Sequence, residues 1–191
     1  MDSFGEKISF ILFVLTVMNV SSSPHPVILV LCYFIHEAGH LFFAKLMRAE
    51  VSNLRASLCR LSIRYDCSRI SHIRECAVVG GGILFNLIFA LLFSLPVVEK
   101  NDAVSFFVIC NISLALMNLY PVSILDGGNA LRCLLNHFFS EEKSVKIMKV
   151  ISFIFAFILW LITVYLQLIF SADVSLFFIS VLLLMELCFS M

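Results

Sequence analysis

Charged side chains are scarce in this sequence, which is 14% charged and 61% hydrophobic. A soluble domain is typically about 25% charged and about 45–50% apolar, so this chain has too little polar surface for a soluble domain or a disordered regulator. Its 13 basic and 13 acidic residues cancel to a formal net charge of zero. A nucleic-acid-binding module with a basic face is therefore also excluded, and we expect no nucleic-acid partner.

Paired cysteine motifs are absent as well. The seven cysteines are scattered, and no two are separated by only two residues, so neither a disulfide framework nor a CxxC metal site is indicated. Three of them, Cys59, Cys67 and Cys76, share one polar loop at spacings of eight and nine. This spacing differs from that of a zinc knuckle and leaves their role open.

Long apolar runs are what the sequence contains in place of these features. A transmembrane helix takes about 20 apolar residues, and six runs in this chain approach or reach that length. We therefore predict an all-α polytopic membrane protein with about six transmembrane helices, formed by residues 1–191 as a single domain. The predicted spans are residues 8–22, 26–47, 77–98, 103–125, 147–170 and 173–191.

The first apolar run is short and admits two interpretations. The small residues of Val20-Ser21-Ser22 could form the cleavage site of a signal peptide. Lys7 is the only basic residue before the run, and Asp2 and Glu6 offset its charge. Because signal peptides begin with a basic region, we favour a retained first helix over a cleaved signal peptide.

The basic residues divide unevenly between the two sides of the predicted bundle. With six spans, the N-terminus, the 48–76 loop, the 126–146 loop and the C-terminus share one side, which collects twelve of the 13 basic residues. Only Lys100 falls on the other side. Cytoplasmic loops carry an excess of Lys and Arg, so we predict that the N-terminus and both loops are cytoplasmic.

Within the 48–76 loop, polar and apolar residues alternate between Arg60 and Tyr65. A period of two residues is typical of strands. We predict a small membrane-associated β-hairpin here, between the second and third spans. The alternative is an Arg-rich loop that rests on anionic lipid headgroups.

The second span contains the sequence His36-Glu37-Ala38-Gly39-His40. Residues four apart share one helix face, so His36 and His40 can offer their imidazoles to one metal ion, with Glu37 beside them as a proton acceptor. Zinc lowers the pKa of a water that it binds to about 7, and a carboxylate can take and return the proton. Ionisable side chains inside a span are costly and usually functional. The alternative is a polar patch that forms hydrogen bonds between helices.

A catalytic zinc ion ordinarily has three protein ligands. The histidines outside the motif lie in or near loops and are expected to be solvated: His25, His72 and His137. Asp126 differs, because it ends the apolar run of the fourth predicted span, shortly after the helix-breaking Pro121 and directly before two glycines. Its predicted depth is compatible with that of His36, so the two can belong to one site.

The sequence resembles the site-2 protease family of intramembrane zinc metalloproteases. The segments that carry the resemblance are His36-Glu37-x-x-His40, Gly82-Ile83-Leu84-Phe85-Asn86 and Asn118-x-x-Pro121-x-x-x-x-Asp126-Gly127. The middle segment departs from the family's Gly-Pro-x-x-Asn pattern, because Ile83 stands in place of proline. In its small size and six predicted spans the chain resembles the branch of the family that processes sporulation factors. We expect no soluble regulatory domain in this chain.

The resemblance implies a role for each motif residue. The implied ligands of Zn²⁺ are His36, His40 and Asp126. Glu37 is the implied catalytic general base. The residues implied to bind or orient the substrate are Asn118, Asn86 and Pro121. The three glycines Gly80, Gly81 and Gly82 also favour close packing of the third span against a neighbouring helix.

The function implied by the resemblance is regulated intramembrane proteolysis. The chain would hydrolyse a peptide bond in or near the transmembrane segment of a single-span membrane protein, as a multi-pass protein of a bacterial plasma membrane. An unidentified membrane regulator is left open. Two other functions compete: a metal-binding transporter or channel, for which only Glu186 offers a further carboxylate within a span, and a catalytically silent relative that binds transmembrane partners. The intact Glu37 disfavours the silent relative.

Overall fold

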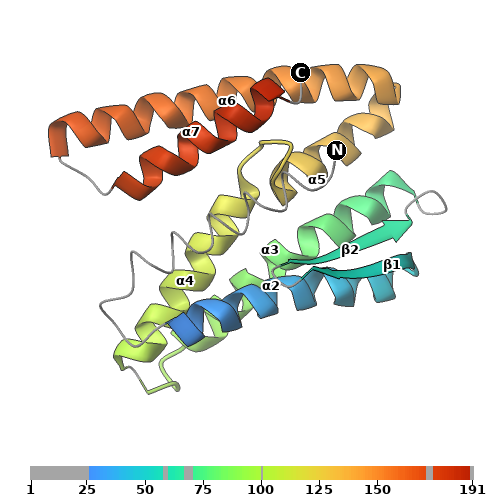
Figure 1. The fold of residues 1–191 in the computed structure, drawn as a ribbon. Coiled ribbons are helices and arrows are strands. Elements are labelled where there is room, and N and C mark those ends of the chain that lie inside the picture. The colour runs from blue at the N-terminus through green and yellow to red at the C-terminus, as the bar shows by residue number, and fades with distance from the viewer. Residues whose placement is uncertain (1–25, 58–59, 67–70, 100, 171–173, 190–191) are drawn as a thin grey trace.

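Helices make up most of the computed structural model, which describes residues 26–57, 60–66, 71–99, 101–170 and 174–189. In these residues six helices accompany one two-stranded sheet (Figure 1). The helices are α2 (Pro26–Leu46), α3 (His72–Ser94), α4 (Asp102–Leu119), α5 (Asp126–Phe138), α6 (Glu141–Phe170) and α7 (Val174–Phe189). The strands are β1 (Glu50–Ser57) and β2 (Arg60–Asp66).

Helices α2, α3 and α4 pack against one another around a small apolar core. Leu29, Cys32 and Ile35 of α2 are buried against Phe107 and Cys110 of α4. These three residues of α2 follow one another at intervals of three and keep one face of the helix on this core, as expected for a helix with one buried stripe.

The backbones of α2 and α3 approach each other closely where two glycines meet. A Cβ atom built on Gly81 would lie 2.6 Å from the carbonyl oxygen of Gly39, and a Cβ on Gly39 would meet the Gly81 carbonyl. Small residues permit such close contact between helices in membranes. The expected packing role of the glycine run therefore holds at Gly81, whereas a Cβ on Gly80 would meet nothing within 4 Å.

Helix α4 ends at Leu119, six residues before the end of the predicted span 103–125. Pro121 lacks an N–H group and disfavours helical geometry at the residue before it, and Tyr120 accordingly adopts an extended conformation. The chain then turns into α5, which begins at Asp126. A Cβ atom on Gly127 would collide with the Leu119 carbonyl, so this turn requires a residue without a side chain.

Helix α5 occupies much of the predicted 126–146 loop. It is amphipathic and packs along α3, where the Cys76 thiol donates a hydrogen bond to the carbonyl of Ala130 at 3.0 Å. Burial raises the pKa of the nearby Cys133 thiol well above its ordinary value, so this cysteine is neutral and packs as a small hydrophobe. The cysteines Cys59 and Cys67 lie outside the described residues.

Helices α6 and α7 form an antiparallel pair on one side of α5 (Figure 1). A buried hydrogen bond of 2.9 Å joins the hydroxyls of Thr163 and Ser180. Ala156 and Leu183 of the same pair pack against Val122, which belongs to the connection between α4 and α5. The pair is thereby attached to the segment that leads to Asp126.

Four of the described helices are long and apolar enough to cross a membrane, and the chain is an integral membrane protein. These segments are Val27–Leu46, His72–Ser94, Asp102–Leu119 and Glu141–Ile169. The first predicted span lies outside the described residues, and α7 has 16 residues, fewer than the about 20 of a typical span. The count of six spans therefore stays a prediction.

The strands β1 and β2 lie within the 48–76 loop and pair in antiparallel register. Ser57 is paired with Arg60 next to the connection, and Glu50 with Asp66 at the other end. The register shifts between Val51 and Asn53, as in a β-bulge. Association of this sheet with the membrane surface stays a prediction.

Candidate metal centre

Helix α2 presents two buried imidazoles on one face. His36 and His40 are 5% and 9% exposed, and their Nε2 atoms lie 3.2 Å apart. The two rings are nearly perpendicular, with their centroids 4.8 Å from each other. A helix carries residues four apart on the same face, so the spacing in the sequence accounts for this pair.

Asp126, the first residue of α5, brings a carboxylate to both histidines. Its Oδ2 atom lies 2.9 Å from Nε2 of His36 and 3.1 Å from Nε2 of His40. The three residues form the one group of His, Cys, Asp or Glu side chains among the described residues whose ligand atoms could hold a metal ion. The contact joins positions 90 residues apart in the sequence.

The spacing of these three atoms fits a metal ion of the size of zinc. Zinc binds His nitrogen and carboxylate oxygen at about 2.0–2.2 Å with tetrahedral geometry, which separates neighbouring ligand atoms by about 3.3 Å. The observed separations of 2.9, 3.1 and 3.2 Å come close to this value. Two imidazoles and one carboxylate also match the donor set of catalytic zinc sites.

The hydrogen bond of His40 to α3 supports the same interpretation. Nδ1 of His40 lies 3.0 Å from the carbonyl oxygen of Val78, and a carbonyl only accepts, so Nδ1 carries the proton. Nε2 of a neutral His40 then has a lone pair directed at the Asp126 carboxylate, which is also an acceptor. A proton from His36 can relieve only part of this repulsion, whereas a cation among the three atoms would relieve all of it.

Helix α3 forms one wall of the cluster, and Gly82 leaves room for the imidazoles there. A Cβ atom on Gly82 would lie 2.5 Å from Nε2 of His40 and 2.6 Å from Cε1 of His36. Val78, Gly82 and Asn86 follow one another at intervals of four residues and therefore share a helix face. On this face the Val78 carbonyl accepts the hydrogen bond of His40, and Gly82 leaves space for the imidazoles. The third residue, Asn86, has a fully buried side-chain amide.

The amide of Asn86 is unsatisfied. Its side chain is completely buried, and neither Oδ1 nor Nδ2 has a hydrogen-bond partner among the described residues. A buried polar group without a partner costs free energy unless a ligand, an ion or water binds to it. Nδ1 of His36 is likewise buried and finds no partner within the described part of the chain.

The other motif residues lie outside the three-residue cluster. Glu37 follows His36 on α2 and is half-buried. Asn118 lies in the last turn of α4, where its amide donates to the Leu114 carbonyl at 3.0 Å. Pro121 lies in the connection to α5 and is half-buried.

The two other histidines of the described residues, His72 and His137, take no part in the cluster. The side chain of His72 is 48% exposed and lies 3.6 Å from the carboxylate of Glu75. His137 packs edge-to-face against Phe138 at the end of α5. His25 lies outside the described residues.

Two contributors to the site are missing from the sequence-based prediction. The Val78 carbonyl leaves no signal in the sequence, because every residue has one. Gly82 does leave a signal, since the glycine run predicts close packing. Which glycine faces a helix and which faces the histidines follows only from the rotation of α3 against α2.

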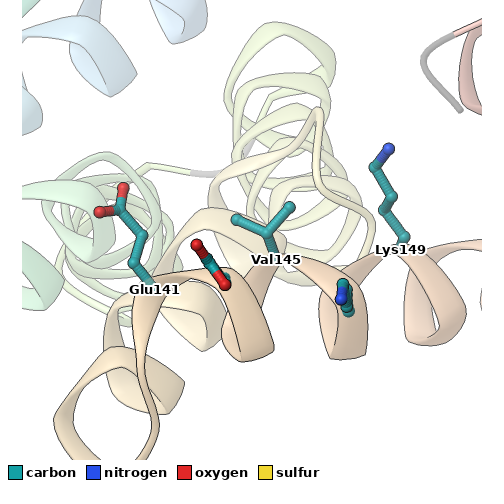
Figure 2. A pocket seen from close by; sticks show the side chains of 5 residues that line it. Glu141, Val145 and Lys149 are labelled. Atoms are coloured by element: carbon teal, nitrogen blue, oxygen red, sulfur yellow. The ribbon is translucent and has the colours of Figure 1, made fainter.

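A surface depression of about 550 Å³ lies over the first turns of α6, apart from the cluster (Figure 2). The residues that line it are Glu141, Glu142, Val145, Lys146 and Lys149. All five belong to a single helix, and the four charged residues among them are two glutamates and two lysines. This arrangement is typical of a solvated helix surface rather than of a ligand pocket.

The chain is similar to known peptidases. Residues 97–162 match the family model described as peptidase family M50. This region contains Asp126 but not His36 or His40, which both lie before it in the sequence. The structure is similar to that of the site-2 protease from Methanocaldococcus jannaschii, with a TM-score of 0.68 and 22% sequence identity over 94% of this chain and 86% of that chain. No curated protein sequence matches the chain significantly.

Proposed function

We propose that this chain, whose resemblance to the site-2 protease family is supported by its match to peptidase family M50 and by its fold, is an intramembrane zinc metalloprotease. The observation that carries the proposal is the meeting of the Asp126 carboxylate with the Nε2 atoms of His36 and His40, at 2.9 and 3.1 Å. These residues would be the three protein ligands of one zinc ion. When bound, zinc would polarise the scissile carbonyl and lower the pKa of the attacking water.

Glu37 is the proposed general base. Glu37 follows His36 on α2 and does not belong to the group of three possible ligands, so we assign its carboxylate the role of the base and not that of a ligand. It would take a proton from the attacking water and deliver it to the amine of the leaving peptide. Both transfers require a carboxylate that can reach the scissile bond, which a residue on the same helix turn as the ligands provides.

The proposed substrate is a peptide bond in or near the transmembrane segment of a single-span membrane protein. Backbone groups of a helix are bonded to one another, so the substrate must unwind locally before water can attack its carbonyl. An unwound substrate presents free N–H and C=O groups. The unsatisfied amide of Asn86 could bind such groups one helical turn from Gly82, and we assign substrate binding also to Asn118 and Pro121.

The proposed topology has six spans, with the N-terminus and the regions 48–76 and 126–146 in the cytoplasm of a bacterial cell. The excess of Lys and Arg on this side supports the assignment. The sheet of β1 and β2 would then lie at the cytoplasmic membrane surface, where an extended substrate segment could pair with one of its edges.

The test is the substitution Glu37→Gln. Purified wild-type protein and the variant are reconstituted with a panel of single-span membrane proteins, and new peptide termini are identified by mass spectrometry. Removing a general base costs about 10²–10⁴ in rate, so we expect cleavage by the wild type and almost none by Glu37→Gln, with equal zinc content in both. The matched control is Glu99→Gln, because Glu99 is exposed between α3 and α4.

Three results would contradict the proposal in different ways. Undiminished cleavage by Glu37→Gln would exclude Glu37 as the base. A wild-type protein without zinc would exclude the metal centre. Zinc flux into sealed vesicles, without any new peptide termini, would favour a transporter over a protease.

A further inference from the structure

The backbone between α4 and α5 is irregular, and one of its N–H groups is satisfied by a different helix. The N–H of Val122 donates to the Tyr120 carbonyl, and that of Leu125 to the Val122 carbonyl, both at 2.8 Å. The N–H of Ser123 instead donates to the hydroxyl oxygen of Ser152 on α6, at 2.9 Å. At membrane depth, non-helical backbone is tolerated only where protein groups or water satisfy its N–H and C=O groups.

Ser152 belongs to a face of α6 that holds this segment in three ways. The residue is completely buried. Three positions further along α6, the Phe155 carbonyl accepts a hydrogen bond from the Tyr120 hydroxyl at 2.8 Å. Ala156, the next residue, is also completely buried and packs against Val122. Positions three and four residues apart share one face of a helix, so these contacts form a single contact surface.

The backbone of Ser123 is in contact with the first turn of α5. A Cβ atom on Gly128 would lie 2.7 Å from the nitrogen of Ser123, so the two backbones are in close contact. Asp126 is only two residues before Gly128 and is the first residue of α5. A shift of Ser123 would therefore move the turn that carries the carboxylate.

We infer that Ser152 is a positioning residue for Asp126: its hydroxyl fixes the Ser123 backbone, and thereby the first turn of α5, so that the carboxylate meets both histidines. The inference rests on the proposed metal centre, although Ser152 itself does not touch the cluster. Groups that hydrogen-bond directly to metal ligands typically change metal affinity by about 10–100-fold when they are removed, and Ser152 acts on the ligand Asp126 one step further away, through the backbone of Ser123. Loss of the Ser152 hydroxyl should therefore weaken zinc binding without removing a ligand.

The experiment measures the zinc affinity of the full-length, detergent-solubilised protein by competition with a chromophoric chelator. We expect Ser152→Ala to bind zinc about tenfold more weakly than the wild type, the lower end of the range for direct partners of metal ligands. Ser152→Thr keeps the hydroxyl and should restore the affinity. The matched control is Ser180→Ala, because Ser180 is also completely buried and its hydroxyl pairs with Thr163 within the α6–α7 pair. This control should bind zinc like the wild type.

Thermal unfolding in the presence of excess chelator separates positioning from general stability. A positioning role is supported if Ser152→Ala and Ser180→Ala lose similar stability without metal but only Ser152→Ala loses zinc affinity. Should Ser152→Ala fail to fold, Ser152→Cys replaces it, since cysteine is of similar size and its sulfur is a weak acceptor. Its zinc affinity should then also fall below that of the wild type.

The possible failures are distinguishable. Wild-type zinc affinity in Ser152→Ala, or in its Cys replacement, would overturn the inference and leave the metal centre intact. An equal loss of affinity in Ser180→Ala would also overturn it, because the effect would then be general. A wild-type protein that binds no zinc would overturn the proposed metal centre and this inference together.

Discussion

His36 and His40 stand on a continuous helix, whereas Asp126 follows a stretch of six residues, 120–125, in which the helix is broken. The two histidines need only the regular geometry of α2 to share a face. The carboxylate needs a proline that ends α4, glycines that permit the turn, and hydrogen bonds that the 120–125 segment donates to α6. The histidine pair is therefore a local property of one helix, whereas the position of Asp126 depends on how α4, α5 and α6 are arranged.

The largest expected effect follows from removing one of the histidines. His36→Ala should reduce the zinc content of the purified protein to background and abolish proteolysis, because a site with two protein ligands no longer meets the needs of catalytic zinc. Metal content is measured by mass spectrometry on protein dialysed against weak chelator. Under the same conditions, Asp126→Ala should give the same result if both halves of the site are required.

His72→Ala is the matched control, since about half of the His72 side chain is exposed and the residue lies outside the cluster. It should keep the zinc content of the wild type. Full zinc occupancy in Asp126→Ala, together with loss in His36→Ala, would show that the histidine pair binds metal without the carboxylate.

The second-largest expected effect is a loss of zinc affinity when the space that Gly82 of α3 leaves beside the histidines is filled. Gly82→Ala places a Cβ atom 2.5 Å from Nε2 of His40, so the imidazoles must move and zinc affinity should fall by on the order of 100-fold. Gly80→Ala is the control, because nothing lies within 4 Å of a Cβ there. This change should leave zinc affinity unaltered and stabilise α3 by up to about 1 kcal/mol.

Chelator competition and thermal unfolding of both glycine variants provide the measurement. Equal zinc affinities in Gly82→Ala and Gly80→Ala would mean that α3 does not confine the imidazoles, and that the histidine pair is positioned by α2 alone.

The parts of the site that the sequence predicts are those set by local geometry. The four-residue interval between His36 and His40 is enough to predict a pair on one face. Asp126 is a candidate because a proline and two glycines surround it, yet its contact with residues 90 positions away depends on how α5 packs. The contribution of Val78 and that of Ser152 come from the packing of α2 on α3 and of α6 on the 120–125 segment, for which spacing offers no signal.

The ends of the helices likewise differ from the ends of the apolar runs from which the spans are predicted. Apolar residues continue to Leu125, which is why hydropathy alone predicts a span over 103–125. The break at Leu119 is a backbone effect of Pro121 that hydropathy does not register. Conversely, α6 begins at Glu141, before the apolar run, because charged side chains at the start of a helix can be solvated while the backbone is already helical.

The smallest expected effect tests the hydrogen bonds that hold the broken segment. Tyr120→Phe removes the hydroxyl that donates to the Phe155 carbonyl but keeps the ring, which packs edge-to-face on Phe155 at 5.6 Å. One such bond contributes about 0.5–1.5 kcal/mol, so we expect a small loss of stability and a decrease in zinc affinity smaller than that of Ser152→Ala. Tyr165→Phe, at an exposed position of α6, should change neither. A loss of zinc affinity in Tyr120→Phe as large as in Gly82→Ala would mean that the 120–125 segment, and not the histidine pair, is the more sensitive half of the site.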